Sequence, residues 1–251
     1  MLIENTIFGM RDKVKIAIER LKEYEPPEGY YLAFSGGKDS QTVYELAKIA
    51  GVKFDAHMNL TSVDPPEVIE FVKKNYPEVE LHRPKKTMFQ LIIENKTPPT
   101  RLMRYCCREI KEVGGSGRFV ITGIRAQEST KRAKRRMVEV CMTDTTKRYI
   151  HPIFDWSESD VWDFIRSRNL AYCKLYDEGW KRIGCLACPM ASEREREFHL
   201  QIYPQYKKAY LRAFEIMLKA KGNDVETPEQ FMHWWIYGQE KIPEGQFSIF
   251  D

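Results

Sequence analysis

A short apolar run, Tyr30–Phe34, leads directly into the string FSGGKDS at Phe34–Ser40, and a helical pattern follows over Asp39–Ala50. This order of strand, glycine-rich turn and helix constrains the fold more than any other feature of the chain. A turn of this kind presents backbone N–H groups at the start of a helix, where the helix dipole favours an anion. The sequence therefore predicts an α/β protein with a phosphate-binding loop.

The residue types in the turn suit a polyphosphate. Gly36 and Gly37 let the backbone approach a ligand closely, and glycine tolerates positive φ. Asp39 is unusual beside an anion, and its expected role is to hold Mg²⁺ that bridges phosphate oxygens. The turn also supplies two hydroxyl groups and one ammonium group, from Ser35, Ser40 and Lys38. The Walker A spacer and GK[ST] ending are missing, and the simpler alternative is a tight turn with polar surface residues.

Apolar runs and helical periodicities alternate through the first half of the chain. Further strands are expected at Phe54–Leu60, Val79–His82 and Arg118–Thr122. Helices are expected at Met10–Tyr24, Pro66–Tyr76 and Met88–Glu94. The alternation predicts a mostly parallel, twisted sheet of five or six strands with helices on both faces. Later in the chain, Val138–Met142 and Arg148–Ile153 are expected as a hairpin or edge pair, and Ser157 as a capping-box start of a helix.

The length of 251 residues suits one large domain or one domain with an extension. We expect an N-terminal helical lead-in at 1–28, a nucleotide-binding α/β core at 29–168 and a helical C-terminal region at 169–251, joined in one compact unit. A hydrophobic share of 43% excludes a disordered chain. A homodimer is compatible with the sequence, which leaves the oligomeric state open.

Neither a membrane-spanning run nor the apolar core of a signal peptide is apparent, so we expect a cytoplasmic protein. In that compartment six cysteines are expected as ligands, nucleophiles or core residues rather than disulfides. Cys141 alternates with Val138 and Val140 and is expected in the core. Cys173 is either a core residue or a free thiol.

The other four cysteines form two pairs, the adjacent Cys106 and Cys107 and the spaced Cys185 and Cys188. Four thiolates suit zinc or an iron–sulfur cluster. Adjacent cysteines on a helix diverge and reach one tetrahedral ion only with strain, whereas a cube of four irons offers separate corners. The spacing therefore favours a 4Fe–4S cluster, with structural zinc as the alternative.

The string SGGKDS resembles the pyrophosphate loop of the adenine-nucleotide α-hydrolase superfamily, whose members cleave ATP between the α- and β-phosphates. The chain from about Gly29 to Pro189 resembles one branch, the phosphoadenosine phosphosulfate reductase family. Four further stretches carry this resemblance: SVDPPEVIEFV at Ser62–Val72, TGIRAQES at Thr122–Ser129, HPIFDWSESDVW at His151–Trp162, and LYDEGWKRIGCLACP at Leu175–Pro189.

The resemblance implies roles for several residues. Phosphate or sulfate would contact Ser35, Gly36, Gly37, Asp39 and Ser40. Gly123 and Arg125 would lie over the nucleotide, and Lys38, Asp39 and Arg125 would carry the catalytic charges. The cysteine pattern is similar to the cluster signature of adenylylsulfate reductases, and it recurs in the ATP pyrophosphatases of DNA phosphorothioation. By resemblance, the metal ligands would be all four paired cysteines.

Adenylylsulfate reductases attack sulfur with a cysteine in a Glu-Cys-Gly-[Ile/Leu]-His type tail, and no cysteine follows Cys188 in this sequence. The preferred interpretation is therefore an ATP pyrophosphatase that adenylates an acceptor for sulfur transfer, with ATP, Mg²⁺ and a 4Fe–4S cluster. The first alternative is an adenylylsulfate or phosphoadenylylsulfate reductase that uses an external thiol. The second is a nucleic-acid-binding redox sensor that carries the cluster.

A basic run follows the proposed nucleotide strand, and five of its six residues are Lys or Arg. These residues are Lys131, Arg132, Lys134, Arg135 and Arg136. In a loop they would meet DNA or RNA phosphates. The alternative is a solvated loop with no partner, which is common for a single charge run.

Overall fold

The computed structural model describes residues 2–6, 9–222 and 226–238 of the chain. Its main sheet has six strands in the order β5-β4-β3-β6-β8-β7. Their bounds are β3 Tyr30–Ala33, β4 Phe54–Asn59, β5 Glu80–His82, β6 Phe119–Ile121, β7 Val138–Val140 and β8 Arg148–Ile150. All neighbouring strands are parallel except β7 and β8. The expected sheet class is confirmed, as is the antiparallel edge pair.

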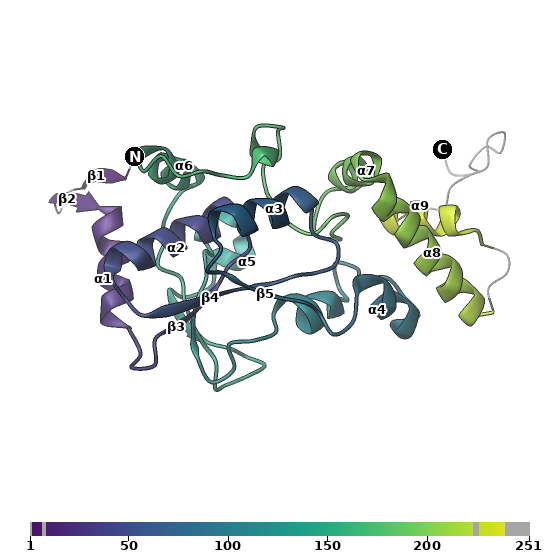
Figure 1. The fold of residues 1–251 in the computed structure, drawn as a ribbon, viewed down its shortest axis with the longest axis horizontal. Coiled ribbons are helices and arrows are strands. Elements are labelled where there is room, and N and C mark those ends of the chain that lie inside the picture. The colour runs from purple at the N-terminus through teal and green to yellow at the C-terminus, as the bar shows by residue number, and fades with distance from the viewer. Residues whose placement is uncertain (1, 7–8, 223–225, 239–251) are drawn as a thin grey trace. The chain divides into compact units, whose positions relative to one another are not determined.

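Helices flank the sheet and make up most of the later part of the chain (Figure 1). The earlier α-helices are α1 Lys13–Glu23, α2 Lys38–Ala50, α3 Pro66–Asn75, α4 Met88–Asn95 and α5 Thr130–Ala133. The later ones are α6 Glu158–Ser167, α7 Glu193–Ile202, α8 Pro204–Ala220 and α9 Pro228–Tyr237. Three short turns are also helical: η1 Cys107–Lys111, η2 Ala126–Glu128 and η3 Lys174–Tyr176.

The N-terminal segment differs from the expected helix at Met10–Tyr24. Two strands, β1 Ile3–Thr6 and β2 Gly9–Asp12, pair antiparallel there. The helix starts only at Lys13, because the Asp12 side chain caps it by accepting hydrogen bonds from the amides of Val14 at 2.9 Å and Lys15 at 3.1 Å. The prediction that Met10–Asp12 are helical was therefore wrong.

The order of the strands reverses beside β3. The chain first adds β4 and β5 on one side of β3 and then returns to place β6 on the other side. The connections that leave the carboxyl ends of β3 and β6 therefore run in opposite directions. In open α/β sheets this switch point leaves a crevice in which ligands bind.

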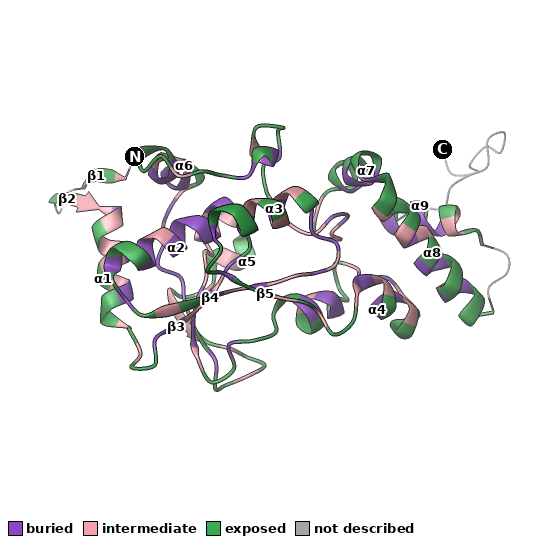
Figure 2. Ribbon diagram, viewed as in Figure 1, coloured by how far each residue is buried: buried purple, intermediate pink, exposed green. Residues whose placement is uncertain are grey.

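The chain folds into two compact units that interleave along the sequence, whereas the expected ranges follow one another in order. The first unit comprises Met1–Asn59, Pro66–His82 and Gly114–Ile183, and the second comprises Leu60–Pro65, Arg83–Val113 and Gly184–Asp251. In the first unit, α2 is buried along most of its length (Figure 2). The second unit has a hydrophobic core in which Tyr210, Phe214 and Trp235 contact one another.

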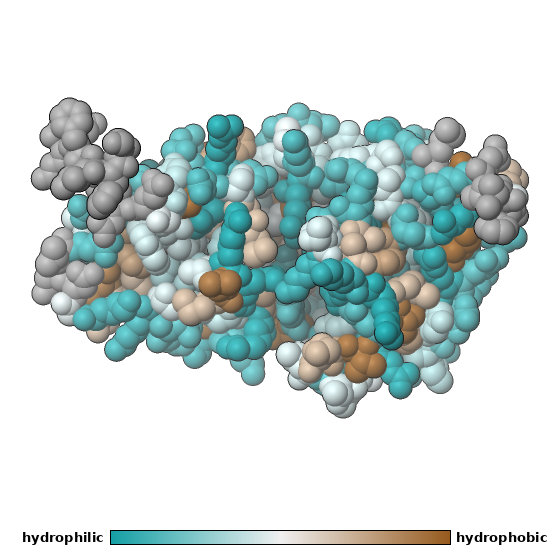
Figure 3. Space-filling model, turned by 180° about the vertical axis from the view of Figure 1, so that it is seen from behind, coloured by the Kyte–Doolittle hydropathy of each residue, from teal (hydrophilic) through white to brown (hydrophobic). Residues whose placement is uncertain are grey.

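Within the described residues, no helix has both the length and the apolar character needed to cross a bilayer. The surface seen in Figure 3 is mostly hydrophilic, and hydrophobic residues form small separate groups on it.

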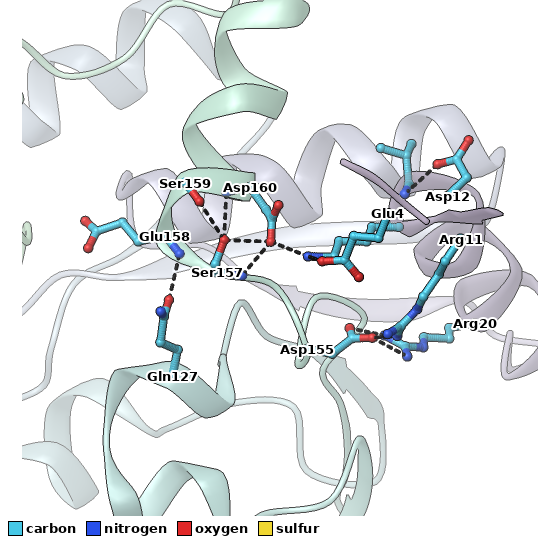
Figure 4. Close-up of polar contacts among 12 residues, drawn as sticks. Glu4, Arg11, Asp12, Arg20, Gln127, Asp155, Ser157, Glu158, Ser159 and Asp160 are labelled. Atoms are coloured by element: carbon cyan, nitrogen blue, oxygen red, sulfur yellow. Dashed lines mark hydrogen bonds and ion pairs between the residues drawn. The ribbon is translucent and has the colours of Figure 1, made fainter. Parts of the chain in front are cut away.

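The start of α6 holds a buried ion pair (Figure 4). Asp160 accepts hydrogen bonds from Lys13 Nζ at 2.6 Å and from the amide and hydroxyl of Ser157, each at 2.7 Å. The side chains of Lys13 and Asp160 are only 6% and 1% exposed. Burial opposes the charged carboxylate, yet these hydrogen bonds lower the pKa of Asp160 below its usual value. The expected capping box at Ser157 is confirmed.

We expect Asp160→Asn to lower the free energy of unfolding by about 3 kcal/mol at pH 7, because Lys13 loses a buried partner. A depressed carboxyl pKa contributes stability above the unfolded value of about 4 and loses it as the pH falls further. Asp160→Asn should therefore also reduce the loss of stability between about pH 4 and pH 2. Urea unfolding across pH measures both effects. Asp163→Asn, on the exposed side of α6, is the control, and equal behaviour of the two variants would contradict the prediction.

Candidate functional site

The glycine-rich turn links the end of β3 to the start of α2. Gly36 adopts φ of +71°, and a Cβ atom there would lie 2.8 Å from Val68 and 2.9 Å from Val72 on α3. Both the backbone conformation and the packing of α3 therefore require glycine at this position. Gly37 has φ of −85° and is the N-cap of α2, so positive φ is needed at one of the two glycines.

The N-terminus of α2 has no side-chain cap, because Gly37 supplies none. The expected hydroxyl groups instead bond within the turn: Ser40 Oγ donates to the Gly37 carbonyl at 2.8 Å and lies 3.2 Å from Ser35 Oγ. The amide of Lys38 donates to the Tyr176 hydroxyl at 2.9 Å. A polar group from elsewhere in the chain thus already uses one of the amides that would face an anion.

Asp39 and Arg125 meet at the switch point of the sheet. Arg125 follows β6, and its Nε donates to Asp39 Oδ1 at 2.6 Å. Gly123 makes this approach achievable, since a Cβ atom there would lie 2.7 Å from the Asp39 carbonyl oxygen. The structure therefore brings together four predicted site residues, Gly37, Asp39, Gly123 and Arg125, although their roles stay predictions.

The electrostatics of Asp39 are balanced between burial and positive charge. Burial raises the pKa of Asp39 above its ordinary value, while Arg125 and Lys38 oppose that rise. Arg125 is itself 5% exposed, and guanidinium stays protonated in proteins. A buried carboxylate that already needs a cation is a suitable ligand for Mg²⁺.

Lys38 differs from its expected position as a free charge for phosphate. Its side chain is 4% exposed, and Nζ donates to the Lys181 carbonyl at 2.8 Å and lies 3.3 Å from Glu158. The ammonium group also lies 5.2 Å from the centre of the Tyr176 ring. Its positive charge nevertheless acts on Asp39 and opposes the rise of the Asp39 pKa.

Tyr176 is a residue of the site that sequence reasoning missed. It lies in η3, contacts the loop through Lys38 and packs against Trp162 with ring centroids 5.0 Å apart. Its position inside the LYDEGW stretch was the available signal.

All four paired cysteines lie in the second unit and are free thiols. Cys106 and Cys107 open a single π-helical turn in which the Cys107 carbonyl accepts from the Glu112 amide at 2.7 Å. A hydrogen bond from Cys106, supported by Arg104 at 3.2 Å, lowers the pKa of the Cys107 thiol to about 6. The same hydrogen bond between the two cysteines raises the pKa of Cys106. Burial and the nearby Cys185 and Cys188 raise it further. The two pairs are thus close enough to interact.

The four thiols are a candidate ligand set for a metal centre. Zinc–sulfur bonds of about 2.3 Å place tetrahedral sulfurs roughly 3.8 Å apart. Among the described residues, no three of the four thiols form a group with all atoms within 4.8 Å. Cys185 Sγ lies 3.5 Å from Thr61 Oγ1, and burial raises its pKa. Four sulfur donors within one unit are chemically suited to a 4Fe–4S cluster, and this ligand assignment stays a prediction.

The remaining aromatic and thiol residues have mostly structural positions. Cys173 is buried, whereas Cys141 is half-buried beside Thr143 and Tyr149, so the expectation of a core position for Cys141 was wrong. Trp235 is buried and donates to the Pro99 carbonyl at 2.8 Å. Trp234 is 38% exposed.

The basic run spans α5 and the turn that follows it. Arg132 pairs with Glu128, and Arg135 pairs with Glu139. Lys131, Lys134 and Arg136 are exposed.

Residues 29–191 match the profile of the phosphoadenosine phosphosulfate reductase domain. The chain belongs to this family. It is 28% identical over 211 residues to an uncharacterized protein of Methanocaldococcus jannaschii, covering 80% of this chain and 51% of the relative. It is also 28% identical over 201 residues to an adenosine 5'-phosphosulfate reductase of Staphylococcus epidermidis, covering 71% of this chain and 79% of the relative. The chain spans about half or less of the length of the curated relatives it matches first.

Solved structures share the family's fold. A phosphoadenylyl-sulfate reductase from Candida auris in a phosphate complex superposes with a TM-score of 0.53 at 17% identity, covering 67% of this chain and 87% of that one. An FMN adenylyltransferase from Candida glabrata, in complex with FAD and pyrophosphate, has a TM-score of 0.50 at 12% identity, covering 70% and 62%. These likenesses concern the fold alone.

We expect Cys107→Ser and Cys185→Ser each to lose most of the iron bound by anaerobically prepared protein, because each removes one thiolate corner. Iron, acid-labile sulfide and visible absorption are the measurements. Cys141→Ser is the matched control and should keep its iron. Colourless, zinc-containing protein, or equal iron in all three variants, would contradict the assignment.

Proposed function

We propose that this chain is an adenine-nucleotide enzyme of sulfur metabolism that binds Mg·ATP at Ser35–Ser40 and adenylates an acceptor for sulfur transfer. The pairing of Asp39 with Arg125 at the switch point carries this proposal. A bare sulfate or phosphate gains nothing from a buried carboxylate at the same loop. A metal-bound triphosphate does, because Asp39 would hold the Mg²⁺ and the metal would neutralise phosphate charge.

In the proposed reaction an acceptor oxygen forms a bond to the α-phosphorus while the bond to pyrophosphate breaks. Negative charge then grows on the leaving pyrophosphate. The uncapped N-terminus of α2 would receive this charge, and Arg125, which pairs with Asp39 through Nε, would donate to a phosphate oxygen. Tyr176 would leave the Lys38 amide or donate its own hydroxyl hydrogen to phosphate.

Cys106, Cys107, Cys185 and Cys188 would hold the cluster. A bound 4Fe–4S cluster supplies either a site for sulfur or a purely structural link. Arg104 donates a hydrogen bond to Cys107 and would stabilise the thiolate form of this cluster ligand.

The test compares ATP with sulfonucleotides as substrates. With ATP, Mg²⁺ and an acceptor RNA, cluster-loaded protein should release pyrophosphate, and AMP should follow when sulfide or water displaces it from the adenylated acceptor. Asp39→Asn should lower kcat about 100-fold or more because the metal loses its ligand. Glu45→Gln, a carboxylate change on the same helix, is the control and should keep full activity.

The chief rival is a reductase of adenylylsulfate or phosphoadenylylsulfate that uses an external thiol, as the names of several relatives suggest. Each sulfonucleotide is incubated with reduced thioredoxin, and sulfite is measured. Sulfite release without any ATP turnover would overturn the proposal in favour of the reductase. No turnover of either kind, together with nucleic-acid binding, would favour a redox sensor.

As an extension of this proposal, the acceptor is a nucleic acid that contacts the basic run. Replacing Lys131, Lys134 and Arg136 with Gln should weaken binding of RNA or DNA at all sequences. The slope of log affinity against log salt should fall by about 2 to 3, since three phosphate contacts are lost. Replacing the exposed Lys22, Lys73 and Lys74 is the charge-matched control. An equal effect in both triple variants would remove the basic run from the proposal.

A further inference from the structure

A group of side chains that can bind a metal lies on the sheet of the first unit. It is separate from the glycine-rich loop and from the cysteines. His57 lies on β4, and Glu80 and His82 lie on β5. One ligand atom of each residue lies within 4.8 Å of the other two. Nδ1 of His57 is 2.8 Å from Nε2 of His82 and 3.4 Å from Oε2 of Glu80.

The parallel register places these side chains on one face. His57 is opposite Glu80, and Asn59 is opposite His82. Ala56 and Met58, which alternate with His57, are buried. The side chains of His57, His82 and Glu80 are 12%, 37% and 66% exposed. The site is therefore mostly buried at His57 and accessible to an ion from the side of Glu80.

The His57 ring is held by partners outside the cluster. Its Nε2 hydrogen-bonds to Asp55, and Asp55 in turn pairs with Arg118 at 2.5 Å. Tyr31 stacks on the ring with centroids 4.2 Å apart and planes within 9°. The Asp55 contact is at Nε2, and it orients the ring with Nδ1 toward His82 and Glu80. A carboxylate behind one nitrogen is the usual support of a histidine whose other nitrogen binds a metal.

Three groups that can each offer a lone pair to a cation lie together here. Nδ1 of His57 lies 3.4 Å from Glu80 Oε2 and 2.8 Å from Nε2 of His82, and Nδ1 of His82 lies 3.8 Å from Glu80 Oε1. A cation between the three groups would bind one atom of each of them.

We propose that His57, Glu80 and His82 bind a divalent transition metal, zinc in the first instance, through Nδ1, a carboxylate oxygen and Nε2. Two imidazoles and one carboxylate leave a fourth position of a tetrahedral ion for water. In the loaded site, Nε2 of His82 would supply a lone pair to the metal and Nδ1 would carry the proton.

The geometry is close to that of a loaded site. Bonds of about 2.0–2.1 Å in a tetrahedron place donor atoms roughly 3.3 Å apart. The two separations from His57 Nδ1, 2.8 Å to His82 Nε2 and 3.4 Å to Glu80 Oε2, bracket that value. A shift of about half an ångström by the more exposed His82 therefore opens the site. The alternative is that hydrogen bonds alone hold His57, Glu80 and His82 together, with no metal.

The test uses cluster-loaded protein, so that the cysteines are occupied. The protein is dialysed against zinc and a chelator of known affinity, and bound zinc per chain is measured. We expect one zinc, with only nitrogen and oxygen neighbours at about 2.0–2.1 Å in zinc-edge X-ray absorption, against about 2.3 Å for sulfur.

Two variants separate the site from a structural role. His82→Ala and Glu80→Gln change accessible side chains and should lose the zinc while keeping the iron and the unfolding transition. Asp55→Asn should weaken zinc binding about 10- to 100-fold, as expected of a supporting carboxylate. His233 lies on α9 and is not part of this site, so the His233→Ala variant is the control and should bind zinc like the unchanged protein. Absence of zinc, sulfur neighbours, or unchanged binding in His82→Ala would overturn the proposal.

Discussion

The contact between Arg125 and Asp39 is the interaction on which the loop site depends. It joins the two connections that leave β3 and β6, the neighbouring strands at which the sheet reverses its order. Gly123 lets the two segments approach until a single added methyl group would meet the Asp39 carbonyl. Strand order, a glycine and one ion pair together fix where two distant segments meet.

The distribution of charge around the loop follows from burial. Lys38 is the residue that the motif offers for phosphate, yet a carbonyl and Glu158 already hold its ammonium group. The positive groups that act on Asp39 are therefore the buried guanidinium of Arg125, the held ammonium group of Lys38 and the helix N-terminus. Preorganised charge of this kind stabilises a developing anion without a further cost of rearrangement.

Features set by local sequence could be predicted, and features set by distant pairing could not. The strands, the loop and the Ser157 cap depend on neighbouring residues, so the sequence sufficed for them. Tyr176 reaches the amide of Lys38 from 138 residues away, and nothing in either segment specifies the other. His57 and His82 likewise come together only because β4 and β5 pair in one particular register. The hydrophobic periodicity of the sequence alone does not reveal that register.

The cysteines show how a motif can specify chemistry and structure together. The adjacent pair lies in the segment Arg83–Val113 and the spaced pair in Gly184–Asp251, yet both segments build one compact unit. Cys106 is part of its hydrophobic core, and Tyr210 in the same core has a pKa raised by burial and further by Cys185 and Cys106. Four thiolates without a metal would repel one another in such surroundings, and a bound cluster removes that repulsion while it cross-links the two segments. On the proposed assignment, the cluster would therefore help to hold this unit together as well as take part in chemistry with sulfur.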